Sequence, residues 1–330
     1  MKKKDERKKE KADRKNREKM KKERYSKMTA SQKSYVRRKA VFDKLWPVCR
    51  FFILFGLCFV IIYPLLFMIS CAFRKRIDMN DPTVMWIPRH FTLDVIKETA
   101  GALDLGNTLL NTVIINLGCS LLAVVSTALT GYGFARFDFK GKKLLFGIVI
   151  MMILVPPQII LLPQYDMFRS LKMINTAWTM YLPAITANGL RSGLMILIFR
   201  QFFRGLPKEL EDAAYLDGCS PLKTFFFVMV PNALSSFLTV FLFSVVWYWN
   251  DYYICNSFFS KNKTLAMMIK NLDAVLSQAL FNDASLKVST RELVVWNQAA
   301  CLISIAPMLI MYLFFQKYFT EGIERSGLAS

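Results

Sequence analysis

The sequence predicts an all-α membrane protein with six membrane-spanning helices, and its composition and charge distribution support this prediction. The 330-residue chain is 54% apolar, more than the roughly 45–50% of a soluble domain. It nevertheless carries 44 Lys and Arg against 24 Asp and Glu, for a net charge of +20. Residues 1–50 hold 21 of the Lys and Arg and 7 of the acidic residues, and long uncharged stretches follow. This segregation excludes a soluble enzyme, a secreted disulfide scaffold and a wholly disordered chain.

Residues 1–45 form a strongly basic tail. A secretory signal has a short basic region followed at once by an apolar core, whereas the first apolar run here begins only at Phe51. High charge and low hydrophobicity predict a disordered segment or a solvated helix. We expect this tail to lie in the cytosol and to fix the topology rather than to bind nucleic acid. Attraction to anionic lipid is the alternative.

Six uncharged runs, the fourth of which is expected to continue past Arg191, are long enough to span a bilayer, which takes roughly 20 residues. The predicted spans cover residues 51–73, 107–135, 144–165, 174–199, 226–250 and 293–316. Several runs contain proline, which membrane helices tolerate because neighbouring groups can satisfy the freed backbone. The six-span domain is therefore expected to cover residues 46–330.

The distribution of Lys and Arg predicts the orientation of these spans. The basic tail indicates a cytosolic N-terminus, and the basic segments 136–143 and 200–223 are then also cytosolic. Six spans place the C-terminus in the cytosol as well. The segments 74–104 and 251–292 are expected outside. The sequence thus predicts a multi-pass protein of the cytoplasmic membrane.

Neither a metal site nor an ATP site is expected in this chain. The seven cysteines form no CxxC pair, and His90 is the only histidine. The chain also lacks a G-x-x-x-x-G-K-[ST] phosphate-binding loop. We therefore expect no cofactor and no enzymatic activity.

The most informative segment is the predicted cytosolic loop 204–223. Pro207 suits the first turn of a helix. Acidic residues, which favour a helix N-terminus, follow it: Glu209, Glu211 and Asp212. Gly218 is a natural C-terminal stop, and Ser220-Pro221 suits the start of a second helix that runs to Pro231. A capped loop helix without a partner is the alternative to a functional role.

This loop resembles the EAA loop of ABC-importer permeases, whose pattern is Glu-Ala-Ala, three residues, Gly, nine residues, Ile, any residue, Leu, Pro. The matching positions are Asp212-Ala213-Ala214, Gly218 and Val228–Pro231. Asp replaces the first Glu, and Val replaces both Ile and Leu. The longer string Pro207–Gly218 resembles the carbohydrate-uptake branch, of which the maltose permease pair is typical.

The resemblance extends from about residue 50 to the C-terminus. Further matching segments lie near the ends of the predicted spans: Gly131–Phe137, Val155–Gln158, Leu162-Pro163, Phe199–Phe203, Trp249–Tyr252 and Gln316–Gly322. Several ordered matches along one chain make a chance likeness improbable.

The resemblance implies a type I ABC-importer permease fold and a transport function. The chain would form the path for a sugar or oligosaccharide together with a second homologous permease subunit. An extracytoplasmic solute-binding protein would deliver the solute, and a cytosolic ATPase dimer would bind ATP and magnesium. Alternatives are a permease for a peptide, an amino acid or a phosphonate, or a stand-alone secondary carrier.

The resemblance also implies which residues couple the chain to the ATPase. They are Glu211, Asp212, Ala213, Ala214, Asp217, Gly218 and Pro231. The segment 208–218 is expected to dock in a cleft of the ATPase, where Glu211 and Asp212 would meet basic groups. Ala213 and Ala214 would leave a small-residue face for close approach.

Two clusters are candidates for the substrate path. Arg191 follows Met173 by 18 residues, which is about 27 Å along a helix and places it near the cytosolic edge of the fourth span. It either snorkels to the interface or faces the path and holds an acidic sugar or a carboxylate of another subunit. The second cluster forms an aromatic belt at the outer interface or stacks on sugar rings: Trp247, Tyr248, Trp249 and Asn250.

Overall fold

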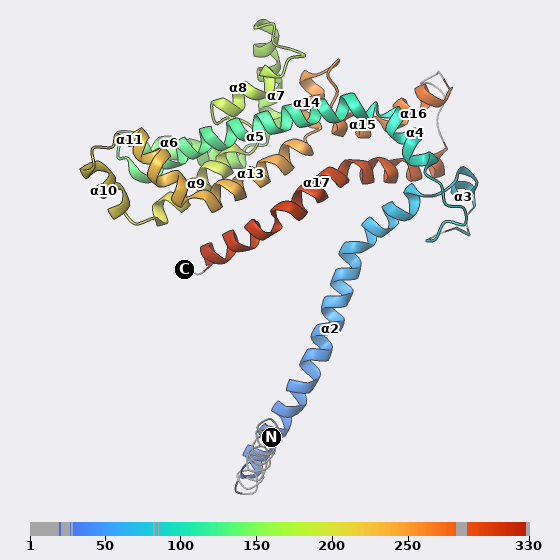
Figure 1. Ribbon diagram of the computed structural model, residues 1–330, viewed down its shortest axis with the longest axis horizontal. Coiled ribbons are helices and arrows are strands. Elements are labelled where there is room, and N and C mark those ends of the chain that lie inside the picture. The colour runs from blue at the N-terminus through green and yellow to red at the C-terminus, as the bar shows by residue number, and fades with distance from the viewer. Residues whose placement is uncertain are drawn as a thin grey trace, which may run out of the picture. The chain divides into compact units, whose positions relative to one another are not determined.

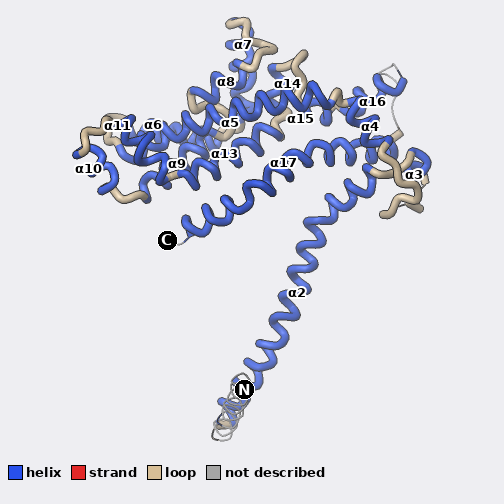
Figure 2. The backbone as a smooth tube through the Cα atoms, in the orientation of Figure 1, coloured by secondary structure: helices blue, strands red, loops and turns tan. Residues whose placement is uncertain are grey.

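The computed structural model describes residues 20, 27, 29–81, 83–84, 86–281 and 289–327. The described segments are helices joined by loops, without a strand among them (Figure 2). Most of the predicted basic tail lies outside the described residues. The chain divides into two units, residues 1–66 and 67–330, and each is described by itself.

The first unit contains most of helix α2 (Ala30–Ala72). The helix begins 21 residues before the predicted span at residue 51, so the last part of the predicted tail is helical. Its apolar portion, Val41–Ala72, is long enough to cross a membrane. Most of its side chains up to Leu66 are exposed, which suits a helix surrounded by lipid.

Three helices form the centre of the second unit: α5 (Leu105–Arg136), α9 (Ser192–Gly205) and α13 (Leu234–Trp249). They lie alongside one another (Figure 1). Gly131 of α5 makes the contact with α9 possible, because a Cβ there would lie 2.7 Å from that of Phe199. The Asn116 side chain of α5 donates a hydrogen bond of 2.8 Å to the carbonyl oxygen of Val245 in α13. In an apolar bundle such interhelical bonds satisfy buried polar groups.

The predicted span 144–165 is not one straight helix. It consists of α6 (Lys142–Leu154) and α7 (Pro157–Ser170), whose axes differ by 103°. Pro156 and Pro157 explain the bend, because proline lacks the N–H that a continuous helix needs and restricts the residue before it.

The predicted span 174–199 is also interrupted. It consists of α8 (Trp178–Ile185) and α9, separated by residues 186–191. Ala187 and Arg191 in this break both have left-handed backbone conformations, with φ of 55° at each. The expectation of a continuous helix is therefore wrong, because hydropathy measures apolar length and not backbone continuity.

The fifth predicted span, 226–250, contains a second sharp bend. The helical segment before it comprises α11 (Pro221–Thr224), the π-helical turn η1 (Phe225–Met229) and α12 (Val230–Asn232). This segment, Pro221–Asn232, meets α13 at an angle of 83°. Pro231 lies just before the bend.

The last helix is α17 (Thr290–Gly327), which contains the predicted sixth span. Among the described residues, α2, α5 and α17 are long and apolar enough to cross a membrane, and two more spans result if each bent pair counts as one. The interrupted pair of α8 and α9 does not meet that test. Six spans therefore remain a prediction.

The segments expected outside also contain helices. The first holds α3 (Arg76–Asn80) and α4 (Asp94–Ala102). There, burial raises the pKa of Asp78, but hydrogen bonds and the charge from His90 outweigh it and hold that pKa below its usual value. The described part of the second segment includes α14 (Tyr253–Phe258), α15 (Leu265–Lys270) and α16 (Leu272–Phe281).

Candidate functional site

The loop between α9 and α13 folds as its local sequence predicts. Helix α10 (Glu209–Leu216) ends before Gly218, whose φ of 79° lies in the left-handed region. The Ser220 hydroxyl then accepts a hydrogen bond from the Lys223 N–H at 3.4 Å and caps α11. The predicted arrangement of helix, glycine turn and second helix is confirmed. Helix α10 thus stands at the end of the bundle, joined to α13 through the bent segment (Figure 1).

Glu211 points into the chain and not away from it. Its side chain is 9% exposed and forms an ion pair with Arg136 at the end of α5, with 3.2 Å between Oε2 and Nε. The Tyr132 hydroxyl donates a hydrogen bond of 2.7 Å to Oε1. Arg136 also donates a hydrogen bond of 2.7 Å to the carbonyl oxygen of Leu206. In this structure the expected meeting of Glu211 with basic groups of an ATPase is replaced by internal partners, and Glu211 fixes α10 to α5.

An aromatic cluster surrounds this ion pair. The Tyr132 ring lies 5.5 Å from that of Phe203 in α9 and 5.1 Å from that of Phe225 in η1, measured between ring centroids. Apolar walls strengthen the ion pair by excluding water. We therefore expect α5, α9 and α10 to move together. Tyr132 and Arg136 were not among the predicted site residues, although both lie in a segment singled out by the resemblance, Gly131–Phe137.

The opposite side of α10 is open. Asp212, Ala213 and Asp217 are exposed, and Leu216 is 89% exposed. Ala214 is buried, so Ala213 and Ala214 do not form one open small-residue face. The free face combines two acidic side chains with a large apolar one. Burial of this exposed leucine against another protein would be favourable because it removes apolar surface from water, and sequence analysis did not single it out.

Pro231 lies away from this face. It belongs to α12, directly after the π-helical turn η1, and the chain bends by 83° two residues later. π-Helical turns are often found at functional sites. Pro231 is thus placed to shape the connection from α10 to α13 rather than to contact a partner through α10.

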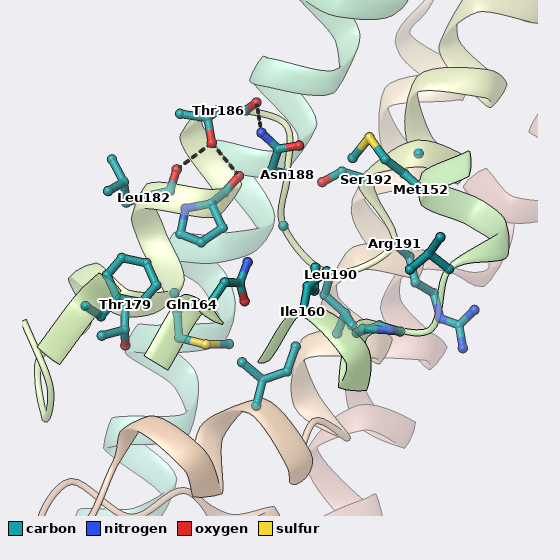
Figure 3. Close-up of a pocket in the computed structure, with 18 of the residues that line it drawn as sticks. Met152, Ile160, Gln164, Thr179, Leu182, Thr186, Asn188, Leu190, Arg191 and Ser192 are labelled. Carbon is teal, nitrogen blue, oxygen red and sulfur yellow. Dashed lines mark hydrogen bonds between the residues drawn. The ribbon is translucent and has the colours of Figure 1, made fainter. Parts of the chain in front are cut away.

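A second candidate site is a cavity of about 730 Å³ beside the interruption between α8 and α9 (Figure 3). Its walls come from α6, α7, α8, α9, α13 and α14. Most lining residues are apolar, and in the part of the chain that the structure describes Arg191 is the one charged residue among them. The polar residues that line it include Gln164, Thr179, Asn188 and Ser192.

Arg191 lies deeper in its span than the sequence predicts. It is the residue directly before α9, which has 14 residues, so it stands about 21 Å along the helix from the coupling-loop end. The Cζ atom lies over the Trp247 ring, 5.5 Å from its centroid. The predicted position near the cytosolic edge assumed a continuous helix, and the break between α8 and α9 removes that assumption.

The four residues of the aromatic cluster point to different places. Tyr248 lines the cavity, and its hydroxyl oxygen accepts a hydrogen bond of 3.1 Å from the Leu190 N–H. Trp249 instead donates from Nε1 to the carbonyl oxygen of Ser304 in α17 at 3.1 Å. The Asn250 amide bonds to its own helix, 2.8 Å from the carbonyl oxygen of Val246. Only Trp247 and Tyr248 are therefore associated with the cavity, the former through Arg191.

The model of one protein family, described as the binding-protein-dependent transport system inner membrane component, matches residues 120–325. This stretch contains both candidate sites and covers more than half of the chain. The chain belongs to this family. As an inner-membrane component with several apolar helices, it is a multi-pass protein of the plasma membrane.

Two proteins similar to this chain are named as transport permeases. The chain is 30% identical to the probable ABC transporter permease protein YurM of Bacillus subtilis (strain 168), over 82% of this chain and 84% of that protein. It is 28% identical to the arabinooligosaccharides transport system permease protein AraQ of Halalkalibacterium halodurans, over 82% of this chain and 92% of that one. These relatives are named as transport permeases and not as enzymes.

A solved structure shows the same fold. The crystal structure of a bacterial ABC transporter involved in the import of the acidic polysaccharide alginate contains a chain that superposes with a TM-score of 0.68. The match covers 84% of this chain and 97% of that one, at 18% sequence identity. The helical fold of this chain is therefore that of an ABC transporter chain.

Proposed function

We propose that this chain is the permease subunit of an ATP-driven importer and forms the path for a sugar or oligosaccharide. The names of its relatives support the solute class. They include the arabinooligosaccharide permease AraQ and the melibiose/raffinose/stachyose import permease MelC, which is 29% identical over 76% of this chain. The expectations of a peptide, amino acid or phosphonate as the solute receive no support from these names.

The observation that carries the coupling part of the proposal is the two-sided construction of α10. Its inner side is fixed to α5 by the buried ion pair of Glu211 and Arg136. Its outer side presents Asp212, Leu216 and Asp217. A surface that is exposed on one side and rigidly attached on the other can transmit the movement of a docked protein to the bundle.

The proposed partners follow from the exposed outer side of α10 and from the opposite end of the bundle. A cytosolic ATPase dimer takes up the outer side of α10 and binds ATP and magnesium itself, so this chain needs no cofactor. An extracytoplasmic solute-binding protein delivers the solute to the opposite end of the bundle. A second homologous permease subunit completes the path. The six-span topology with both termini in the cytosol belongs to the same proposal.

The proposal is tested by purifying the tagged full chain from its native membrane under mild conditions. We expect an ATPase subunit, a second permease and ATP hydrolysis that increases when the solute-loaded binding protein is added. The solute is identified by uptake of labelled arabinotriose, raffinose and sn-glycerol 3-phosphate into cells with and without the gene. Purification without any ATPase, or the same uptake of all three solutes in both strains, would contradict the proposal.

The docking face is tested by single substitutions. Leu216→Glu should abolish the stimulation of ATP hydrolysis and release the ATPase, because it places a charge where an apolar side chain docks. Leu222→Glu is a matched control, since Leu222 is also exposed, at 64%, but lies on α11. Equal loss in both variants would locate docking elsewhere than on α10.

A further inference from the structure

We propose that the interruption between α8 and α9 is a binding site for the anionic group of the transported solute, a carboxylate or a phosphate on a saccharide. This inference rests on the proposed function and specifies its substrate class. The site consists of the Arg191 guanidinium, the Ser192 hydroxyl and the N-terminal end of α9, at the edge of the cavity of about 730 Å³ (Figure 3).

The interruption is held in place from both sides. The Ser126 hydroxyl of α5 donates a hydrogen bond of 2.6 Å to the carbonyl oxygen of Ala184, near the end of α8. On the other side, the Tyr248 hydroxyl of α13 accepts from the Leu190 N–H. The first bond ties the end of α8 to α5, and the second satisfies a backbone N–H that lies in the break. The break is therefore stabilised by tertiary hydrogen bonds and is not a local distortion.

The charge of the cavity has one sign. Arg191 is positive, and among the described residues no acidic side chain lines the cavity. Arg191 is exposed and faces Trp247, a contact with the aromatic ring that leaves the N–H groups at the guanidinium edge free to bind a ligand. Arg191 lies about 14 Å along the helix from residue 200, where the expected cytosolic segment begins, so its charge lies within a hydrocarbon layer of about 30 Å and needs water or a counter-ion there.

Ser192 is a further observation, independent of the charge of Arg191, that indicates a ligand at this site. It is 1% exposed, and its hydroxyl has no hydrogen-bond partner in the part of the chain that the structure describes. It lines the cavity beside Arg191. Figure 3 shows its oxygen on the side of Asn188 and the Arg191 guanidinium directed the other way, so the long Arg191 side chain must turn toward Ser192 for both to hold one anionic group. A buried polar group without a partner is costly, so a donor in this position indicates a ligand oxygen.

The three elements agree on the chemistry of the ligand. A guanidinium binds carboxylate and phosphate through parallel hydrogen bonds. A helix N-terminus favours negative charge, and α9 is long enough to provide that effect. Gln164, Thr179 and Asn188 offer amide and hydroxyl groups on the same cavity for the hydroxyls of a sugar. A neutral sugar would leave Arg191 without a counter-ion.

The test compares uptake of a uronic-acid trisaccharide, a polyol phosphate and a neutral trisaccharide by the complete importer in cells. The probes are trigalacturonate, sn-glycerol 3-phosphate and raffinose. In Arg191→Gln we expect uptake of the anionic solute to fall at least tenfold, equivalent to about 1.4 kcal/mol, whereas Arg191→Lys retains part of it. The first two probes distinguish a carboxylate from a phosphate as the bound group.

Ser192→Ala separates ligand binding from a structural role. The substitution removes a hydroxyl without a partner, so we expect the melting temperature in lipid nanodiscs to stay the same or rise. The concentration of anionic solute for half-maximal uptake should nevertheless increase severalfold. Arg169→Gln is the matched control, because Arg169 is exposed near the end of α7 and does not line the cavity.

Each remaining outcome overturns a different statement. Uptake of raffinose alone by the unaltered importer, or full uptake of the anionic solute in Arg191→Gln, overturns the anionic site but leaves the saccharide permease intact. Equal loss of anionic and neutral uptake in Arg191→Gln assigns Arg191 to membrane anchoring. Absence of uptake for all three solutes and for arabinotriose contradicts the proposed function itself.

Discussion

At the scale of single residues, the ion pair between Arg136 and Glu211 is the contact on which the coupling loop depends. Both side chains are below 10% exposed. Removing one partner leaves an uncompensated buried charge, at a cost of about 3–5 kcal/mol. We therefore expect Arg136→Ala to lower the melting temperature in nanodiscs and to uncouple ATP hydrolysis from transport.

A double variant, Arg136→Met with Glu211→Leu, provides the matched test. It removes both charges together and should lose much less stability than either single variant. If it also remains uncoupled, the ion pair transmits movement as well as stabilising the loop. The solvent-accessible pair of Arg89 and Asp81 is a further control, since solvent screens its charges and Asp81→Asn should change stability little. Equal losses at the buried and exposed pairs would contradict the assignment.

The sequence pattern identified the acidic residues of α10 but not the direction in which each side chain points. Glu211 and Ala214 are three residues apart and share the buried face, while Asp212 and Leu216 share the open one. Which of these faces is buried depends on the contact of α10 with the end of α5, and this contact joins residues far apart in the sequence. Periodicity within eight residues carries no such information, so Glu211 and Asp212 were given the same role.

At the scale of elements, Gly218 determines how α10 is followed by α11. Its φ is 79°, and a Cβ at this position would meet nothing within 4 Å. The constraint is therefore conformational and not steric. We expect Gly218→Asn to retain most coupling, because asparagine enters the left-handed region more readily than other residues with a Cβ. Gly218→Val should lose coupling, at a cost of about 1–2 kcal/mol or more.

The measurement for Gly218 is the stimulation of ATP hydrolysis by the solute-loaded binding protein. Gly141→Val serves as the matched control, because Gly141 also has a positive φ, of 84°, and open space around its Cβ position. It lies in the other expected cytosolic loop, before α6. Full coupling in Gly218→Val, or equal loss in Gly141→Val, would show that the turn after α10 has no special part in coupling.

The interrupted helices show how far elements can be predicted. The bend between α6 and α7 has a local cause in Pro156 and Pro157, which was visible in the sequence. The break between α8 and α9 has no proline within it, because Pro183 lies inside α8. Hydrogen bonds from α5 and α13 hold this break open. Contacts of this kind come from residues about 60 positions away and cannot be inferred from the local pattern.

At the scale of the whole molecule, the distribution of positive charge predicts which end of the bundle faces the cytosol. In the second unit, α10 and α11 lie at one end of α13, and α14 and α15 lie at the other (Figure 1). Helix α13 has 16 residues and spans about 24 Å, most of a hydrocarbon layer. The coupling loop and the segment 251–292 should therefore lie on opposite sides of the membrane.

Single-cysteine labelling tests this topology in the complete importer. One variant keeps only the native Cys219, which lies in the coupling loop and is partly exposed. The second replaces all seven native cysteines and carries Lys261→Cys, at an exposed position between α14 and α15. We expect a membrane-impermeant maleimide to label Cys219 only in inside-out vesicles and position 261 only in right-side-out vesicles. Labelling of both positions from the same side would contradict the proposed orientation, because an odd number of spans must separate them.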